Sequence, residues 1–561
     1  MTWRYRFTLF FFLIVFALII MRLFYWQVVR AQELSVIGQE QYDEQVVSSA
    51  QRGEIKTSDG FTIAADKLAY LVYANPKVVT NLPQESDTLG KLLDIKSATI
   101  SALLSEDKFW VALKPNVDNS VKEKVDAKHL PGVGFQEETV RFYPEASMAA
   151  NLLGFVGKDQ NGNDKGYFGL EGYYDRQLSG KNGYAVVVHD AAGHPILAKM
   201  NDSTVKVDGR DLVLNIDRRV QFILDEELKA GIAKYGAKSG MAAVMDPKTG
   251  GIVAMSSFPT FDPAHYQDYD ESLYANPFIT STYEPGSTFK PIVMASAMDA
   301  GLVKPNTQCT ICSGPVEIGG YAVHTWDDNY FPNTTMTDVI VHSDNTGMVF
   351  VGEKLGLDRM IDYLQKFGIG DTTGIDLQGE EAPEIHPKDQ WYPIDLATAT
   401  FGQGITVTPI ELLDAISAIA NNGKRMEPHV VAAVQTPDGQ TIPIPPQEID
   451  QPISQTSAQV MTQIMVDAVN NGESKFYRLK GYDIAGKTGT AQIPVAGHYD
   501  PSKTIASFVG FAPATDPKFV MLVILDEPSA SIYGAETAAP IFFSVAKDLL
   551  LYYGIPPNAG E

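Results

Sequence analysis

A long apolar run near the N-terminus limits what this chain can be more than any other feature of its sequence. Residues Phe7–Met21 include a single polar side chain, and the apolar character continues to Val29. About 23 helical residues at ~1.5 Å each are enough to cross a bilayer once. Tyr25 and Trp26 are typical of a membrane interface. A signal peptide and a buried core helix are the alternatives, but no small-x-small cleavage site follows closely. We therefore expect a membrane-spanning signal anchor over residues 7–29.

The net charge excludes some classes of function. Lys and Arg number 44 while Asp and Glu number 68, so the formal net charge is −24. An acidic chain without a Lys/Arg-rich run repels phosphate backbones, so we expect no nucleic acid partner. The nine histidines form no zinc-binding pattern. We expect neither a metal site nor another cofactor.

The two cysteines, Cys309 and Cys312, form a Cys-x-x-Cys motif. Zinc would need two further ligands at suitable spacing, and a redox motif would need a thioredoxin-like context. We find neither in the sequence. In an exported protein we expect a local disulfide, with two free buried thiols as the alternative.

Patterning divides the chain after the anchor into a stalk and a first folded region. Residues 31–50 are polar with widely spaced apolar side chains, which is typical of a stalk. The region 51–203 mixes strand-like and helix-like segments. Leu68–Pro76 has the composition of a strand, and the apolar residues of Leu89–Leu104 have helical spacing after a possible Ser-Asp cap at 86–87.

A second region begins near Asp208. Asp217 is a candidate N-cap for an amphipathic helix, and Gly240–Phe258 places two apolar runs around a turn, which predicts a hairpin. Lys518–Pro528 predicts a buried strand and Phe543–Tyr553 a closing helix. With 561 residues and 45% hydrophobic content, roughly two to four domains are expected. We predict a tail at 1–6, the anchor at 7–29, an α+β domain at 30–205, an α/β domain at 206–553 and a frayed tail at 554–561.

Ser287 and Lys290 form the first candidate catalytic motif, Ser-x-x-Lys, where a helix would begin after Pro285-Gly286. Residues three apart share a helix face, so Lys290 can reach the Ser287 hydroxyl. Lysine can act as the base if its pKa falls, and a helix N-terminus lowers it. The pattern alone is weak evidence, because it recurs at Ser105, Ser203 and Ser544.

Two further motifs follow in order. The first is Ser343-Asp344-Asn345, and the second is Lys487-Thr488-Gly489-Thr490, in a segment that could be a strand. Lys487 adds positive charge for an anionic group, Thr488 and Thr490 offer hydroxyls, and Gly489 would let a substrate backbone approach closely. Another Lys-Thr-Gly begins at Lys248, where the predicted hairpin turn explains it.

The ordered set Ser-x-x-Lys, Ser-Asp-Asn, Lys-Thr-Gly is the signature of penicillin-binding proteins and active-site serine β-lactamases. The chain resembles a class B penicillin-binding protein, a monofunctional peptidoglycan DD-transpeptidase, over nearly its whole length. A single anchor without C-terminal appendages is more similar to the cell-division branch than to the elongation branch. One departure is Thr57-Ser58-Asp59-Gly60, where the family commonly has Asp-Arg-Asn/Asp-Gly. Further similar motifs are Arg52–Ile55, Arg141–Pro144, Gly169–Asp175, Phe401–Gly404 and Thr408-Pro409.

The resemblance implies a fold and an orientation. The 30–205 region would be a pedestal of the dimerisation type, and 206–553 a penicillin-binding/serine β-lactamase-like transpeptidase domain with an antiparallel sheet flanked by helices. Arg4 and Arg6 before the span balance Arg22 and Arg30 after it, so these charges do not orient the anchor. Because the family's substrate lies outside the cytoplasmic membrane, the resemblance places the N-terminus inside and the catalytic domain outside.

The resemblance also implies a two-step acyl transfer. The catalytic residues would be Ser287 as nucleophile, Lys290 as base and Ser343 as proton relay. Substrate would be bound by Asn345, Lys487, Thr488, Gly489 and Thr490. The backbone N–H groups of Ser287 and Thr490 would form an oxyanion hole. The implied partners are D-Ala-D-Ala stem peptides with an amine acceptor, β-lactams, the membrane, a membrane glycosyltransferase and other cell-division proteins.

Two alternatives remain open. A DD-carboxypeptidase or β-lactamase would need a base for water, for which Glu380, Glu381 and Glu384 are candidates, although such a cluster is more often a solvated surface. A non-catalytic β-lactam-binding scaffold or sensor is the other. A sensor would need a cytoplasmic output domain, and the residues before the span are too few to form one.

Overall fold

The computed structural model describes residues 2–35, 43–145, 148–189, 195–495 and 498–558. The chain forms two compact units. The first comprises Met1–Arg52 and Ser179–Gly209, and the second comprises Gly53–Leu178 and Arg210–Glu561.

The first unit contains the apolar N-terminal helix. Helix α1 spans Trp3–Phe24 and continues into a π-helical turn, η1, over Tyr25–Val29. The apolar stretch within Trp3–Val29 has a mean hydropathy of 2.7, and none of it is buried. Its apolar side chains are therefore not covered by protein. This helix includes the predicted span and is long and apolar enough to cross a membrane.

A three-stranded antiparallel sheet completes the first unit, in the order β1 (Asp43–Ser48), β8 (Gly183–His189), β9 (Pro195–Thr204). The prediction of a stalk over 31–50 is therefore wrong for β1, while residues 36–42 lie outside the described part. Strand β1, which is mostly polar, pairs with a strand far along the chain. Local polarity gave no signal of that partner, because strand formation depends on the neighbouring strand.

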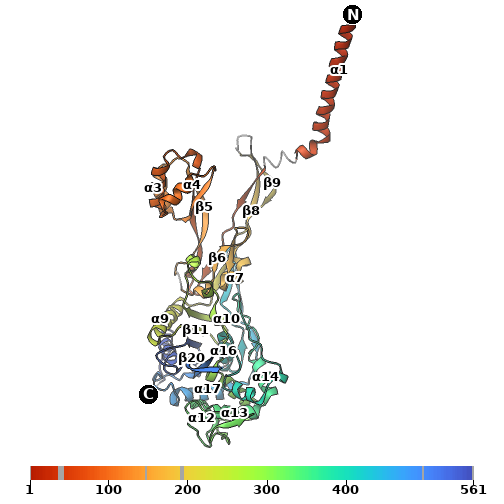
Figure 1. The fold of residues 1–561 in the computed structure, drawn as a ribbon. Coiled ribbons are helices and arrows are strands. Elements are labelled where there is room, and N and C mark those ends of the chain that lie inside the picture. Colours follow the sequence, from red (N-terminus) through yellow and green to blue (C-terminus); the bar gives the residue numbers. More distant parts are fainter. Residues whose placement is uncertain (1, 36–42, 146–147, 190–194, 496–497, 559–561) are drawn as a thin grey trace. The chain divides into compact units, whose positions relative to one another are not determined.

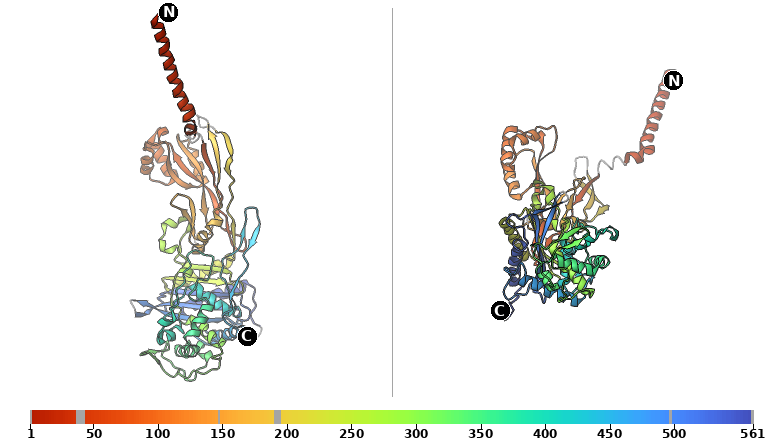
Figure 2. Two further views of the ribbon diagram at one scale, coloured as in Figure 1. Left: turned by 90° about the vertical axis from the view of Figure 1, so that its right-hand side faces the viewer. Right: turned by 60° about the horizontal axis from the view of Figure 1, so that its bottom comes forward.

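The second unit begins with a seven-stranded mixed sheet ordered β17-β16-β10-β2-β3-β4, with β5 also paired to β3. The predicted strand Leu68–Pro76 falls in β3. In Figure 2, β3 and β5 are orange and the hairpin β16–β17 is cyan, so segments distant in sequence share this sheet. The strands are β2 (Ile55–Lys56), β3 (Thr62–Ala74), β4 (Val111–Val117), β5 (Val133–Phe142), β10 (Asp211–Leu214), β16 (Val431–Gln435) and β17 (Thr441–Pro443).

Helices α3 (Leu82–Leu93) and α4 (Ser97–Leu104) pack on β3 and β4 through buried leucines and Ile100. The predicted cap at 86–87 is wrong, because α3 begins earlier. Asn81 accepts a hydrogen bond from the Gln84 N–H, and a proline follows in the first turn. Asn at the cap and Pro in the first turn are favourable at a helix start, and this signal competes with the later Ser-Asp pair.

Two of the motifs that resemble the family meet in a buried ion pair. Arg141 Nε, at the end of β5, lies 2.7 Å from Glu171 Oε1 in α7, and both side chains are buried. Strands β6 and β7 pair as a hairpin. These smaller elements are α5 (Asn119–Asp126), α6 (Ala150–Leu153), β6 (Phe155–Lys158), β7 (Asp164–Tyr167), α7 (Gly169–Tyr173) and α8 (Asp175–Leu178).

The second sheet has five antiparallel strands ordered β12-β11-β21-β20-β19. The predicted hairpin at 240–258 and the buried strand at 518–528 are confirmed. Both faces of the sheet are covered. Residues of β21 are therefore buried whichever face their side chains lie on. The strands are β11 (Ser239–Met245), β12 (Ile252–Phe258), β19 (Ala485–Val495), β20 (His498–Ala512) and β21 (Phe519–Asp526).

Helices α9 (Arg218–Tyr235) and α18 (Ala538–Tyr552) cover one face of this sheet, and α11 (Lys290–Asp299), α16 (Pro409–Ala420) and α17 (Gln455–Asn471) belong to the core on the other (Figure 1). The predicted cap of α9 is confirmed, since Asp217 accepts from two N–H groups of the first turn. Helix α18 begins five residues before the predicted start at Phe543, about one and a half turns at 3.6 residues per turn. The implied fold, an antiparallel sheet flanked by helices, is confirmed.

Cys309 and Cys312 are joined by a disulfide and buried, as the first of our two alternatives predicts. The tail is not frayed over 555–558, because the Asn558 N–H donates to Gly481 O and Tyr482 Oη donates to Ile555 O. Residues 559–561 lie outside the described part. The remaining elements are η2 (Pro76–Val78), η3 (Pro263–Asp268), η4 (Glu271–Leu273), α10 (Pro277–Thr280), η5 (Gly286–Phe289), β13 (Val316–Ile318), β14 (Tyr321–Val323), α12 (Met336–Val341), α13 (Asn345–Leu355), α14 (Leu357–Lys366), η6 (Lys388–Gln390), α15 (Pro393–Ala399), β15 (Arg425–Met426) and β18 (Glu448–Asp450).

Candidate active site

Ser287 lies on a short 3₁₀ turn, η5, that leads directly into α11. Its side chain is half-buried, whereas Lys290, the first residue of α11, is fully buried. Gly286 has a left-handed backbone with φ of 58°. A Cβ at Gly286 would lie 3.3 Å from Ala491 Cβ on β19, so the turn is pressed against that strand. The predicted helix start at the Ser-x-x-Lys motif is confirmed.

Lys290 contacts the second motif rather than Ser287 itself. Its Nζ donates to Ser343 O at 2.6 Å, to Asn345 Oδ1 at 2.8 Å and to Ser343 Oγ at 3.3 Å. Ser343 Oγ in turn donates to Ser287 Oγ at 3.0 Å. Within the described residues, the link from Lys290 to Ser287 that we expected to be direct therefore runs through Ser343. The hydrogen bonds of the Lys290 amine go to oxygen atoms of Ser343 and Asn345 in the second motif.

The electrostatic environment of Lys290 favours its neutral form. Burial lowers the pKa of Lys290 well below its ordinary value, and the positive charge of Lys487 lowers it further, while Asp344 and Glu473 oppose the shift. Desolvation disfavours an ammonium because the protein replaces its water. A lysine in this state can accept a proton near neutral pH.

The middle residue of Ser-Asp-Asn explains how the second motif is held. Asp344 caps α13, and its Oδ1 accepts from the N–H groups of Thr346 and Gly347. Ser343 just before it has a left-handed backbone with φ of 56°, which is strained for a residue other than glycine. The cap fixes Asn345 on the next position, so Ser343 and Asn345 both reach Lys290.

The third motif lies on β19, as the sequence predicts. Lys487 and Thr488 are buried, and Lys487 Nζ donates to Thr488 O at 3.1 Å and to Thr488 Oγ1 at 3.0 Å. Thr490 Oγ1 accepts from the Gly534 N–H at 3.0 Å. Burial lowers the pKa of Lys487, and the charge of Glu473 opposes this.

The space that we expected at Gly489 is filled by the protein itself. A Cβ at Gly489 would lie 2.3 Å from Ser507 Oγ and 2.8 Å from Thr288 Cγ2. No side chain fits there, because β19 lies against β20 on one side and against η5 on the other. Gly489 is therefore required by the packing of the strand against the Ser287 turn.

Residues outside the three motifs, which the sequence does not identify as site residues, also hold the Ser287 turn. Gly402 O accepts from the Gly286 N–H at 2.9 Å, and a Cβ at Gly402 would lie 2.2 Å from Gly286 O. Glu284 accepts from the Gly404 N–H at 3.1 Å and from Tyr499 Oη at 3.1 Å. Burial raises the pKa of Glu284. The Phe-Gly-Gln-Gly motif was noted as a resemblance, but its contact with the turn depends on tertiary packing.

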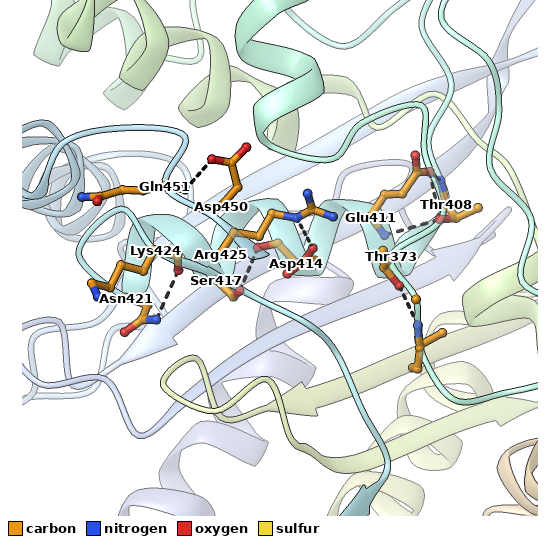
Figure 3. Close-up of polar contacts among 12 residues, drawn as sticks. Thr373, Thr408, Glu411, Asp414, Ser417, Asn421, Lys424, Arg425, Asp450 and Gln451 are labelled. Atoms are coloured by element: carbon orange, nitrogen blue, oxygen red, sulfur yellow. Dashed lines mark hydrogen bonds and ion pairs between the residues drawn. The ribbon is translucent and has the colours of Figure 1, made fainter. Parts of the chain in front are cut away.

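Helix α16 anchors the segment that follows Gly404. Figure 3 shows Glu411 directed back at Thr408, whose N–H lies 2.6 Å from Glu411 Oε2 in a capping box. The same helix carries Asp414, paired with Arg425 Nε at 2.6 Å (Figure 3). The capping box fixes the start of α16, and the buried ion pair joins the middle of the helix to Arg425.

Two exposed aromatic rings are further residues near the motifs that the sequence did not reveal. Trp326 and Tyr533 lie edge to face with ring centroids 5.8 Å apart. Trp326 Nε1 donates to His342 O, next to the second motif, and Tyr533 precedes the glycine that donates to Thr490. Exposed aromatic residues in loops carry no distinctive spacing, so only the structure finds them.

The second Lys-Thr-Gly, the acidic cluster and the other Ser-x-x-Lys pairs have separate surroundings. Lys248 is in the turn between β11 and β12, and its ammonium is paired with Asp516 rather than free in water. Glu380 accepts from the N–H groups of Thr373 and Gly374, so it stabilises a loop instead of being fully solvated as expected. The other serines of Ser-x-x-Lys pairs are Ser105 after α4, Ser203 in β9 and Ser544 in α18.

Comparison with known proteins decides the family. The family model described as Penicillin binding protein transpeptidase domain matches residues 240–547, and that described as Penicillin-binding Protein dimerisation domain matches residues 47–214. Stage V sporulation protein D of Bacillus subtilis is 34% identical over 568 residues, covering 100% of this chain and 87% of that protein. This chain belongs to the penicillin-binding protein family. The predicted family and enzyme class are thereby confirmed.

Other penicillin-binding proteins agree in sequence and in fold. Peptidoglycan D,D-transpeptidase FtsI of Escherichia coli is 29% identical over 521 residues, which cover 91% of this chain and 85% of FtsI. A peptidoglycan synthetase structure from Bifidobacterium adolescentis has a TM-score of 0.74 and 27% identity, covering 92% of this chain and 98% of its own. Penicillin binding protein 3 from Mycobacterium tuberculosis, complexed with aztreonam, has a TM-score of 0.71 and 26% identity, covering 91% of this chain and 98% of its own. These similarities are consistent with the predicted cell-division branch. The domain bounds 30–205 and 206–553 stay predictions.

Proposed function

We propose that this chain is a membrane-anchored peptidoglycan D,D-transpeptidase that crosslinks stem peptides through an acyl-enzyme on Ser287. The observation that carries the proposal is the hydrogen-bonded chain from Ser287 Oγ through Ser343 Oγ to Lys290 Nζ. A serine is a weak nucleophile until a base takes its proton, and a buried lysine with a lowered pKa supplies that base.

The first step forms the acyl-enzyme. For proton transfer the two hydroxyls would reverse their present directions, so that Ser287 Oγ donates to Ser343 Oγ and Ser343 Oγ donates to the neutral amine of Lys290. Ser287 Oγ then attacks the carbonyl carbon of the D-Ala-D-Ala peptide bond while its proton passes through Ser343 to Lys290. When the C–N bond breaks, that proton returns through Ser343 to the leaving D-Ala amine. In the second step an amine of a neighbouring stem peptide attacks the ester carbonyl carbon and loses a proton to Lys290. That proton returns through Ser343 to Ser287 Oγ as the ester C–O bond breaks. One amide bond breaks and one forms.

The remaining site residues bind the substrate. Lys487 and Thr490 on β19 would bind the terminal carboxylate of the donor or of a β-lactam. The backbone N–H groups of Ser287 and Thr490 would bind the developing oxyanion, which is usually a leading contribution to acyl transfer. Asn345 accepts from Lys290 through Oδ1 and donates one amide N–H to His324 O at 3.0 Å, so its second amide N–H would donate to the substrate carbonyl.

In this proposal the anchor would hold the catalytic domain on the outer side of the cytoplasmic membrane. Peptidoglycan lies on that side, so Arg4 and Arg6 would be inside and the residues after Val29 outside. The similarity to FtsI supports a role in division, with a membrane glycosyltransferase and other division proteins as partners.

Turnover of a peptide substrate tests this function. The full-length protein in detergent is incubated with a D-Ala-D-Ala stem peptide substrate and an amine acceptor. We expect release of D-Ala together with crosslinked product, and neither with Ser287→Ala. D-Ala release without crosslinks would make the protein a carboxypeptidase, and no turnover alongside β-lactam binding would make it a scaffold.

A further inference from the structure

Glu473 is a carboxylate beside the third motif that belongs to none of the three motifs. It follows Gly472 at the end of α17 and is half-buried. Its Oε2 accepts a hydrogen bond from Thr488 Oγ1 at 2.6 Å. A short hydrogen bond from a hydroxyl to a carboxylate is among the stronger hydrogen bonds of proteins.

This contact fixes the direction of the hydrogen bonds that Thr488 makes in the third motif. A threonine hydroxyl has one proton, and Thr488 donates it to Glu473. Toward Lys487 the same oxygen can only accept, and Lys487 Nζ lies 3.0 Å away. The charges of Lys487 and Glu473 are therefore joined through one oriented hydroxyl.

The ammonium of Lys487 keeps one donor for a ligand. It has three N–H groups, of which one donates to Thr488 Oγ1 and one to Thr488 O. Within the described part of the chain these are its hydrogen bonds. The third N–H matches a single carboxylate oxygen of a substrate. In this arrangement the Thr488 hydroxyl has no proton left for the substrate, which differs from the role that the resemblance implies for it.

We propose that Glu473 is a positioning residue that, through Thr488, holds the Lys487 ammonium in place and keeps it charged for the substrate carboxylate. The proposal rests on the proposed function, because it assigns a role in recognising the donor carboxylate of that reaction.

The charges around Lys487 explain why a partner is needed. The groups that face it are Lys290 from α11, Glu473 from the end of α17 and, through Lys290, Asp344 at the start of α13. Lys487 is buried, and an unpaired buried ammonium is costly. A nearby positive charge on Lys290 would add repulsion, so Glu473 provides the compensating charge on the Lys487 side.

Glu473→Gln separates charge from geometry. Glutamine keeps an oxygen that accepts from Thr488 but removes the negative charge. The second-order rate of penicillin acylation of full-length protein in detergent is measured from pH 6 to 10. Because Glu473 favours the charged forms of both lysines, we expect both limbs of the pH profile to move to lower pH, the alkaline limb by about one unit. At pH values on the descending alkaline limb of the unmodified protein, acylation of Glu473→Gln should be about tenfold slower than that of the unmodified protein.

Matched variants and a neutral probe isolate the effect. Asp467→Asn removes a negative charge from the same helix α17, where Asp467 contacts Gln463, and should leave the profile unchanged. Thr488→Val removes the hydroxyl that joins Lys487 to Glu473 and should slow acylation as Glu473→Gln does. A penicillin methyl ester lacks the carboxylate, so at pH values above the acidic limb Glu473→Gln should change its acylation rate by less than about twofold. Thermal melts confirm folding of each variant.

Other outcomes would overturn the proposal. A lower rate without movement of either limb would reduce Glu473 to a structural role, and an unchanged profile would remove its role altogether. Slower deacylation with normal acylation would make Glu473 a base for water. Failure of the unmodified protein to be acylated would instead refute the proposed function, on which this inference depends.

Discussion

Lys290 is the residue whose surroundings decide whether Ser287 can react. It is fully buried, close to the positive charge of Lys487 and hydrogen-bonded to Ser343 and Asn345. These conditions favour the neutral amine, and the Ser343 hydroxyl connects that amine to the nucleophile. The strained backbone of Ser343 is consistent with a functional position, since strain of this kind persists where the surrounding structure imposes it.

The two Lys-Thr-Gly motifs allow a matched comparison of single residues. Lys487→Ala removes a buried positive charge beside the proposed carboxylate site, so acylation by penicillin should slow by about a hundredfold or more. Lys248→Ala removes an exposed ion pair to Asp516, which is worth about 0.5 kcal/mol and lies outside the site. Its acylation rate should be unchanged. Second-order acylation rates and thermal melts measure both effects, and equal losses would mean that the third motif was assigned to the wrong copy.

The order of the motifs in the sequence predicted which residues meet, but not how they contact one another. Ser287, Lys290, Ser343 and Asn345 come together as expected. That Ser343 lies between Lys290 and Ser287 depends on packing between α11 and α13, which spacing does not encode. Glu473 and Glu284 were missed because a single carboxylate in an acidic chain has no distinctive pattern. Their partners come from distant elements.

At the scale of elements, the loop before α16 holds the 3₁₀ turn that carries Ser287. Gly402 has φ of 78°, and a Cβ there would lie 2.2 Å from Gly286 O. Gly402→Ala should therefore destabilise the protein by about 2 kcal/mol and displace the turn. Displacement of a nucleophile by about 1 Å can cost a hundredfold in rate, so we expect a loss of about that size in acylation.

Gly439→Ala is the matched control for Gly402→Ala. Gly439, in the turn between β16 and β17, has a similar φ of 85°, but a Cβ there would meet nothing within 4 Å. It should cost about 1 kcal/mol of backbone strain and leave acylation unchanged. Thermal melts and acylation rates distinguish the two, and equal acylation in both variants would contradict the role assigned to Gly402.

Helix α16 makes the stability of the protein depend on pH. Burial raises the pKa of Glu411 from 4.5 to about 7, although hydrogen bonds from Thr408 and Gly370 oppose this. The folded chain thus keeps a proton that the unfolded chain has lost. Between about pH 4.5 and 7 the free energy of unfolding should fall as pH rises, by about 3 kcal/mol for this group.

The difference between the unmodified protein and Glu411→Gln isolates that contribution. Glutamine does not titrate, so the variant should gain stability relative to the unmodified protein as pH rises from 5 to 8. Thermal unfolding midpoints at several pH values measure it. Parallel pH dependences in the two proteins would show that Glu411 is ionised in the fold at all of these pH values.

Local patterns predicted the elements whose stability is local, and missed those that depend on a distant partner. Alternating and continuous apolar runs correctly predicted β11, β12 and β21. The sequence predicts a stalk at β1 because the partner strand β8 lies far along the chain. It predicts a frayed tail at 555–558 because the contacts of these residues with 481–482 are likewise tertiary.

For the molecule as a whole, helix α1 is long and apolar enough to cross a membrane. If the catalytic domain is extracytoplasmic, protease added to cells with a permeabilised outer layer should digest the chain after Ala31. Cleavage products are followed with an antibody to the transpeptidase domain, and a cytoplasmic protein should stay intact as a control. Protection until the cells are lysed would place the large unit in the cytoplasm and exclude access to peptidoglycan.

Labelling with penicillin can establish whether Ser287 is the acylated nucleophile. Full-length protein is incubated with the label, digested, and the modified peptide is identified by mass spectrometry. We predict one adduct, on Ser287, that persists for many minutes and is absent from Ser287→Ala. A label on Ser105, Ser203 or Ser544, or release of the label by rapid hydrolysis, would contradict the account.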